Sequence, residues 1–93
     1  MTIEAEFAAL GSTPDRVAKS LQAKGIQGRL RSGDNCPLAL FAESLGMKDP
    51  WIGNDGTLVY GNKFWGKKIL LPKACRQFQR QFDRQDYPAL IRR

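Results

Sequence analysis

The stretch from Leu71 to Arg84 constrains the fold of this chain more than any other part of the sequence. Its apolar residues recur at the three- and four-residue spacing of one helical face, and they are Leu71, Ala74, Cys75, Phe78 and Phe82. Pro72 suits the first turn of a helix, and Tyr87-Pro88 suits its end. The spacing predicts a long amphipathic helix that reaches about Gln85 and packs its apolar face on a small core.

The same stretch carries a second stripe, of positive charge. Its cations are Lys73, Arg76, Arg80 and Arg84. A segment just before it mixes lysines with an aromatic residue, at Lys63, Trp65, Lys67 and Lys68. Surfaces that bind single-stranded nucleic acid combine rings that stack on bases with cations that contact phosphates. The alternative, which the sequence leaves open, is that the tryptophan packs at the edge of the core and the lysines are only solvated.

Positive charge is concentrated in the last third of the chain. The 93 residues carry a net charge of +6. Residues 63–93 hold nine Lys/Arg against two Asp, whereas residues 1–15 hold three acidic residues and no cation. A basic surface increases the rate of encounter with polyanions. The charge therefore predicts nucleic acid or an acidic protein surface as the partner, and it leaves the oligomeric state open.

Composition argues against several classes of protein. The chain has no histidine and only two cysteines, Cys36 and Cys75. The Cys-His and Ser-His pairs of most nucleophilic enzymes are therefore missing, and two thiols do not complete a zinc site. No apolar run approaches the ~20 residues that cross a membrane, and the start of the chain lacks the features of a signal peptide. We expect a cytoplasmic protein that is not an enzyme and binds no cofactor, metal or membrane.

The rest of the chain predicts an α+β fold in a single domain of residues 1–93. Helices are expected over residues 2–10, 13–24 and 36–46, with N-caps at Thr2, at Thr13, and at Asp34 or Asn35. Residues 26–31 alternate apolar and polar, as a half-buried strand does. Residues 47–71 are rich in turn residues between short apolar runs, which predicts a meander of two or three strands. Together with the strand at 26–31, the meander could form one small antiparallel sheet covered by helices.

The first two predicted helices allow a functional interpretation besides the structural one. Two helices joined by a short glycine-containing turn could form a helix-turn-helix that binds DNA. The outward residues of its second helix would be Arg16, Lys19, Ser20 and Gln22. The alternative, which we favour, is a helical hairpin with a structural role only.

Cys36 allows two interpretations. It is expected at a helix N-terminus, near Arg29 and Arg31, and both surroundings lower a thiol pKa. That would indicate a reactive cysteine. Because no base or resolving cysteine lies near it in the sequence, we favour the alternative of a small, buried, inert thiol.

Two phrases of the sequence resemble a group of small uncharacterised bacterial and phage proteins. The first phrase is Gly28-Arg29 with Cys36-Pro37-Leu38-Ala39 and Phe41, and the second is Leu71-Pro72 with Phe78, Phe82-Asp83, Tyr87-Pro88 and Leu90. That group has no assigned activity, so the resemblance implies no catalytic residue. It implies that both phrases belong to one fold, in which Asp83 and Tyr87 form a structural corner with a hydrogen bond at the helix end.

Two functions remain. The first is a small basic regulatory or nucleic-acid-binding module that contacts phosphates through the final helix, helped by the residues of the preceding segment. The alternative is a protein–protein interaction module, a regulator or inhibitor of phage or mobile-element origin, which docks on an acidic face of a larger complex.

Overall fold

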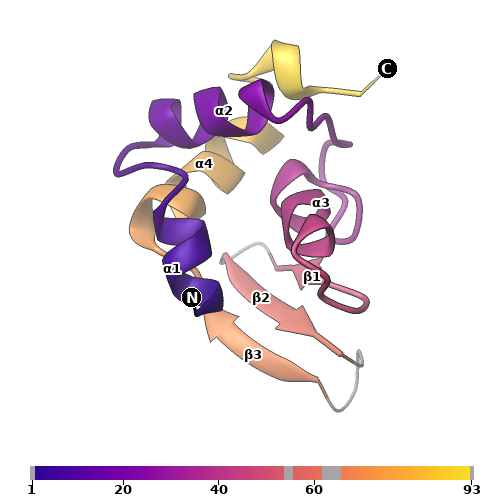
Figure 1. Cartoon of the computed structure of the whole chain (residues 1–93). Coiled ribbons are helices and arrows are strands. Elements are labelled where there is room, and N and C mark those ends of the chain that lie inside the picture. Colours follow the sequence, from indigo (N-terminus) through magenta and orange to yellow (C-terminus); the bar gives the residue numbers. More distant parts are fainter. Residues whose placement is uncertain (1, 54–55, 62–65, 93) are drawn as a thin grey trace.

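The computed structural model describes residues 2–53, 56–61 and 66–92 of the chain. These residues form helices and one antiparallel sheet, so the predicted α+β class is confirmed (Figure 1). The elements are α1 (Ile3–Ala8), α2 (Pro14–Ala23), α3 (Pro37–Ser44), β1 (Trp51–Ile52), β2 (Thr57–Tyr60), β3 (Lys67–Leu70), α4 (Lys73–Asp83) and the 3-10 helix η1 (Pro88–Leu90). The sheet forms one end of the molecule, and α2 and η1 lie at the other end.

Local chemistry starts the first two helices as predicted. The Thr2 hydroxyl accepts a hydrogen bond from the Ala5 N–H at 3.1 Å, and the Thr13 hydroxyl accepts one from the Arg16 N–H at 3.2 Å. Each hydroxyl satisfies a backbone donor that the helix itself leaves unpaired. At α3 the prediction was wrong, because Cys36 is the N-cap and makes no side-chain capping bond.

The sheet is a meander in the order β1-β2-β3. Its register pairs Ile52 with Leu58 and Leu58 with Ile69 on the face that packs on the core. Successive side chains of a strand point to opposite faces, so Trp51, Val59 and Lys68 share the outer face. The predicted turns between these strands fall partly on residues 54–55 and 62–65, which lie outside the described residues.

The strand predicted at residues 26–31 is wrong. In this segment the structure has a single parallel bridge between Gly28 and Ile91. The Gly28 N–H donates to the Leu90 carbonyl at 2.8 Å, and the Gly28 carbonyl accepts from the Arg92 N–H at 2.8 Å. A Cβ on Gly28 would lie only 2.6 Å from the Asn35 carbonyl oxygen, so the chain passes here in close contact with backbone on both sides. The segment is held by the C-terminal tail and takes no part in the sheet.

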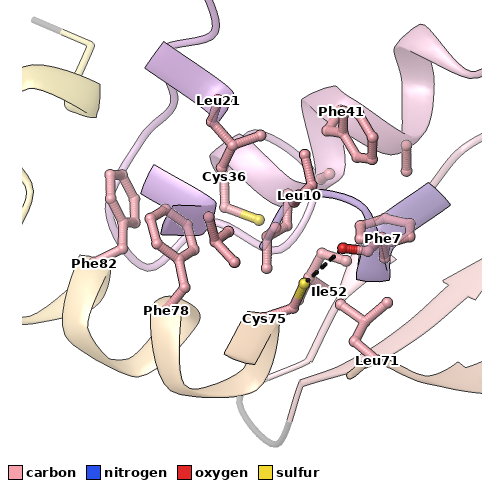
Figure 2. Packing of buried hydrophobic residues seen from close by; sticks show 14 of the residues in the cluster. Phe7, Leu10, Leu21, Cys36, Phe41, Ile52, Leu71, Cys75, Phe78 and Phe82 are labelled. Carbon is pink, nitrogen blue, oxygen red and sulfur yellow. Dashed lines mark hydrogen bonds between the residues drawn. The ribbon is translucent and has the colours of Figure 1, made fainter. Parts of the chain in front are cut away.

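The apolar stripe of the final helix is the centre of the core, as predicted. All of its residues are buried, from Leu71 and Ala74 through Cys75 and Phe78 to Phe82. Figure 2 shows Phe78 and Phe82 pointing from α4 toward α2, and Cys75 close to Phe7 of α1. The helix is shorter than predicted, because Pro72 is its N-cap and the backbone turns left-handed at Gln85, where φ is 69°.

Candidate functional site

Three cations, Lys73 and Arg80 of α4 and Arg84 at its C-cap, lie on one exposed face of the helix. Lys73, Arg80 and Arg84 are all exposed, and a residue advances 100° around an α-helix, so they fall within about 40° of one another. At ~1.5 Å of rise per residue, the row from Lys73 to Arg84 is about 16 Å long. We call these three residues the α4 stripe. Gln77 lies between them and is partly exposed.

The α4 stripe is not used to hold the fold together. In the part of the chain that the structure describes, no hydrogen bond or ion pair engages the side chains of these three residues. The neighbouring carboxylate of Asp83 instead accepts the backbone N–H of Arg31, at 3.0 Å. The three charges are therefore available to a partner, without a competing internal contact to break.

Arg76, the fourth predicted cation of this helix, has a structural role. Its Nε donates to the Leu71 carbonyl at 3.1 Å, and its side chain is partly buried. The stem of the side chain lies so close to Gly56 that a Cβ at that glycine would collide with it. Arg76 thus closes the junction between the start of α4 and the start of β2. Its charge is less available to a partner than those of the α4 stripe.

The described residues of the predicted basic segment before α4, Lys67 and Lys68, do not join the α4 stripe. Lys67 and Lys68 are exposed at the start of β3, and no hydrogen bond or ion pair with another described residue engages either side chain. That end of β3 is the one remote from α4 (Figure 1). Lys63 and Trp65 lie outside the described residues. The residues that the sequence grouped as one site thus occupy at least two separate surfaces.

Both cysteines are buried thiols. Burial in apolar surroundings raises the pKa of Cys36 to about 11, although backbone N–H groups of Ala39 and Leu38 act in the opposite direction. Burial also raises the pKa of Cys75 to about 12, and its thiol donates to the Phe7 carbonyl at 3.5 Å. At neutral pH both are protonated, and a protonated thiol is a poor nucleophile. The structure therefore agrees with the favoured interpretation of Cys36 as a buried, unreactive thiol.

The helix-turn-helix interpretation loses one of its outward residues. The Ser20 hydroxyl donates to the Leu10 carbonyl at 2.5 Å, so Ser20 ties α2 to the end of α1. Arg16, Lys19 and Gln22 are exposed. The opposite face of α2 packs on α4 and η1, so α2 has a structural role in the core.

Asp83 and Tyr87 have the structural contacts expected of a corner. Asp83 holds the Arg31 N–H, as described above. The Tyr87 hydroxyl lies 2.9 Å from an Asp15 carboxylate oxygen and 2.7 Å from the Gln81 amide oxygen, and its ring stacks on Phe78. Burial and the neighbouring Asp15 carboxylate raise the pKa of Tyr87 to about 12. Both side chains brace the end of α4 against distant parts of the chain.

Gln79 is the polar residue of α4 that the sequence reasoning missed. Its side chain is 3% exposed, and its amide oxygen has no hydrogen-bond partner within the described structure. The helical spacing could have found it, because Gln79 follows Cys75 by four residues and so falls on the apolar side of α4. A buried amide oxygen without a partner is unfavourable, and its presence calls for an explanation.

The described parts of the chain hold neither a metal-binding group of three or more side chains nor a membrane-spanning helix. Across residues 2–53, 56–61 and 66–92, no group of three or more His, Cys, Asp or Glu side chains could hold a metal ion. None of the helices described there has the length and apolar character needed to span a membrane. In comparisons with known proteins, no family model, curated protein or solved structure matches this chain.

Proposed function

We propose that this protein is a small, non-enzymatic binding module whose α4 stripe contacts the phosphates of a nucleic acid. The observation that carries the proposal is the row of three exposed cations on one helical face, none of which is engaged within the described fold. Each strand of a duplex carries a phosphate every ~3.4 Å of axis, so a row of about 16 Å spans roughly five phosphates.

Contacts of this kind position a protein on nucleic acid without reading its sequence. The amide of Gln77, between the cations, could add a hydrogen bond to a phosphate or sugar oxygen. Lys67 and Lys68 offer a second, smaller group of charges on another surface. A cytoplasmic location belongs to the same proposal, and the two free thiols support it, since reducing compartments preserve free thiols.

The test is a salt titration of binding to random duplex and single-stranded DNA and RNA. Neutralising three phosphates gives a slope of log K against log salt of about −2.7 for duplex and about −2 for single strands. The variant Lys73→Gln/Arg80→Gln/Arg84→Gln should remove most of this binding and most of the slope, while Arg76 is kept because it supports the fold. Its matched control is Lys19→Gln/Arg29→Gln/Lys48→Gln, which removes three exposed charges outside α4.

Two results would overturn the proposal. One is no binding by the wild-type protein at ~50 mM salt, a concentration that permits phosphate contacts. The other is equal affinity of the two triple variants, because the charge of the whole molecule, and not the α4 stripe, would then set the binding.

The second candidate is a protein–protein module, a regulator or inhibitor of phage or mobile-element origin that docks on an acidic face of a larger complex. A specific observation favours it, namely apolar side chains on the outer face of the sheet: Leu70 is 61% exposed and Trp51 is 39% exposed. Large exposed aromatic and aliphatic side chains commonly anchor protein interfaces. Pull-down from a host lysate with and without nuclease separates the candidates, since nuclease removes only partners that nucleic acid bridges.

A further inference from the structure

The two edges of the sheet differ in how they are occupied. At the β1 edge, the Ile52 N–H donates to the Gly33 carbonyl at 2.8 Å, so a loop already pairs with that edge. β3 is the other edge strand, and in Figure 1 no described helix or strand runs along its outer side. Lys67, Lys68 and Leu70 of β3 are all exposed. An edge strand left open in this way can pair with a strand from another chain.

The register shows which backbone groups of β3 face the open side. The Leu71 N–H donates to the Gly56 carbonyl at 3.2 Å, so the backbone of residue 71 faces β2. The backbone groups of successive residues in an antiparallel strand point in alternate directions across the sheet, so Ile69 also faces β2, whereas Lys68 and Leu70 face outward. Within the described residues, no hydrogen bond engages the N–H or C=O groups of these two residues. The open edge therefore offers two donors and two acceptors.

The side chains along this edge combine positive charge with an apolar anchor. Lys68 and Leu70 point to the outer face of the sheet, and Lys67, which pairs with Tyr60, points to the inner face. No ion pair engages either lysine within the described part of the chain. Leu70 is 61% exposed, more than any other large apolar side chain that the structure describes. A strand that pairs here would meet two cations at one end of β3 and an apolar side chain at the other.

We propose that β3 binds an extended acidic segment of a partner protein, which joins the three-stranded sheet as a further strand. Extended peptides bind open sheet edges through main-chain hydrogen bonds, and their alternate side chains provide specificity. Antiparallel pairing, as in the rest of this sheet, makes the partner run from a residue opposite Leu70 to one opposite Lys67. Carboxylates suit the two positions opposite the lysines, and an apolar side chain suits the position opposite Leu70. The expected segment therefore has an apolar residue, any residue, and then two acidic residues.

A second copy of this chain fits the edge less well. Two β3 strands could form the same backbone bonds, with Lys68 of each copy opposite Leu70 of the other. That pairing would bring together the lysines of two molecules that each carry a net charge of +6, and like charges oppose it. Lysines on an edge strand also discourage pairing with neutral strands, so the charges that protect this edge favour an acidic partner. The proposal gives a binding mode to the second candidate function and rests on it, without requiring that the α4 stripe bind nucleic acid.

The first test is an NMR titration of the full chain with the peptide acetyl-Thr-Leu-Thr-Glu-Glu-Thr-amide. Its leucine would pair with Leu70, and its two glutamates would pair with Lys68 and Lys67. The amide N–H signals of Lys68 and Leu70 should shift and exchange more slowly with solvent, because both groups gain acceptors. A Kd on the order of a millimolar suits a peptide of this size. The same peptide with glutamine in place of both glutamates should bind about tenfold more weakly at low salt.

N-methylation of the peptide separates strand addition from attraction between charges. Methyl groups on the backbone nitrogens of the leucine and the first glutamate remove the two N–H groups that would face β3, so binding should weaken at least about tenfold. The matched control carries its methyl groups on the threonine between them and on the second glutamate, whose N–H groups would face away, and it should bind within about threefold of the unmodified peptide. The proposal is overturned if the unmodified peptide causes no shift at about 20 mM, well above a millimolar Kd. It is also overturned if the two methylated peptides bind equally.

Variants of the protein give a second, independent test. Leu70→Pro removes an outward N–H that no described bond uses, and edge strands tolerate proline at such positions, so the fold should persist while the peptide binds at least about tenfold more weakly. Leu70→Ala keeps the N–H and should bind the peptide better than Leu70→Pro. Lys67→Gln/Lys68→Gln should weaken the peptide about tenfold, whereas Lys19→Gln/Arg29→Gln, which removes two exposed charges outside the sheet, should not. Should Leu70→Pro not fold, these two double variants still decide, and equal affinity of the pair contradicts the proposal.

The pull-down described above distinguishes failure of this proposal from failure of the second candidate function. If the peptide does not bind, but the wild type and Leu70→Pro capture the same protein after nuclease treatment, that protein uses another surface and only the proposal for β3 fails. If nuclease removes every captured protein, the second candidate function fails and the proposal for β3 fails with it.

Discussion

At the scale of the residue, Phe78 contributes more to stability than the spacing of α4 alone indicates. It is fully buried, its ring centroid lies 5.9 Å from that of Phe82 and 5.2 Å from that of Tyr87, and it joins α4 to the C-terminal turn. Phe78→Ala should lower the free energy of unfolding by about 3–5 kcal/mol, because the surroundings cannot fully fill the space. That is a large share of the ~5–15 kcal/mol that stabilises a typical domain. Urea unfolding measures it, with Leu70→Ala, on the exposed outer face, expected to change stability by less than ~0.5 kcal/mol.

The raised pKa values of the two buried thiols, also features of single residues, lead us to expect that stability depends on pH. The pKa of Cys36 is about 11 and that of Cys75 about 12 in the folded protein, against 9.0 for an ordinary thiol. Because the folded state holds the proton more tightly, the stabilisation is complete below pH ~9 and is lost as the pH rises through ~11 for Cys36 and ~12 for Cys75. Each thiol can contribute up to ~1.4 kcal/mol of lost stability per pH unit in that interval. Thermal unfolding from pH 7 to 10.5 tests this, and a Tm that stays constant above pH 9 in wild type would contradict it.

At the scale of the element, the sequence predicted what depends on neighbours along the chain. Thr2, Thr13 and Pro14 start their helices through bonds and dihedral preferences within one turn, so residue type and position were enough. The strand at residues 26–31 failed for a different reason. Alternation correctly indicated that Ile26 and Leu30 are partly buried, but burial does not say which backbone the segment pairs with.

The candidate sites also divide into features that depend on neighbours along the chain and features that depend on tertiary packing. The α4 stripe follows from helical spacing and could be predicted, whereas the structural role of Arg76 depends on Gly56, twenty residues earlier. The meeting of Gln79, Gly33 and Trp51 could not be predicted at all, because these residues come together only after the loop of residues 31–34, β1 and α4 have packed against one another.

The contact of residue 28 with the C-terminal tail gives a prediction for this scale. A Cβ on Gly28 would lie 2.5 Å from the Pro37 nitrogen and 2.6 Å from the Asn35 carbonyl oxygen, and both are backbone atoms that cannot move aside easily. Gly28→Ala should therefore lower stability by at least ~1–3 kcal/mol, as overpacking does. Hydrogen exchange should also show faster exchange at the N–H of residue 28 and of Arg92. A matched control is Gly25→Ala, where no atom lies within 4 Å and only the φ of 72° opposes the change, at about 1 kcal/mol.

At the scale of the whole molecule, positive charge should oppose folding as well as attract a partner. The net charge is +6 and much of it lies on exposed, unpaired side chains, so bringing these charges together in the folded state is repulsive. Raising the ionic strength from ~0.01 to ~0.15 M shortens the Debye length from about 30 to about 8 Å and screens this repulsion. The Tm of the wild-type protein should therefore rise with salt, whereas its affinity for nucleic acid should fall.

The opposite effects of salt on the Tm and on the affinity separate two roles of the α4 stripe, its repulsion within the folded protein and its attraction to a partner. Lys73→Gln/Arg80→Gln/Arg84→Gln removes half of the net charge without removing a described internal contact, so its Tm at low salt should equal or exceed that of the wild type. The dependence of its Tm on salt should also be weaker. Arg76→Gln removes one charge too, but it loses the bond to the Leu71 carbonyl and the cover over Gly56, so its Tm should fall at every salt concentration. If the triple variant were instead less stable than the wild type, the α4 stripe would contribute to the stability of the fold. Weaker nucleic-acid binding by that variant would then no longer identify a contact surface.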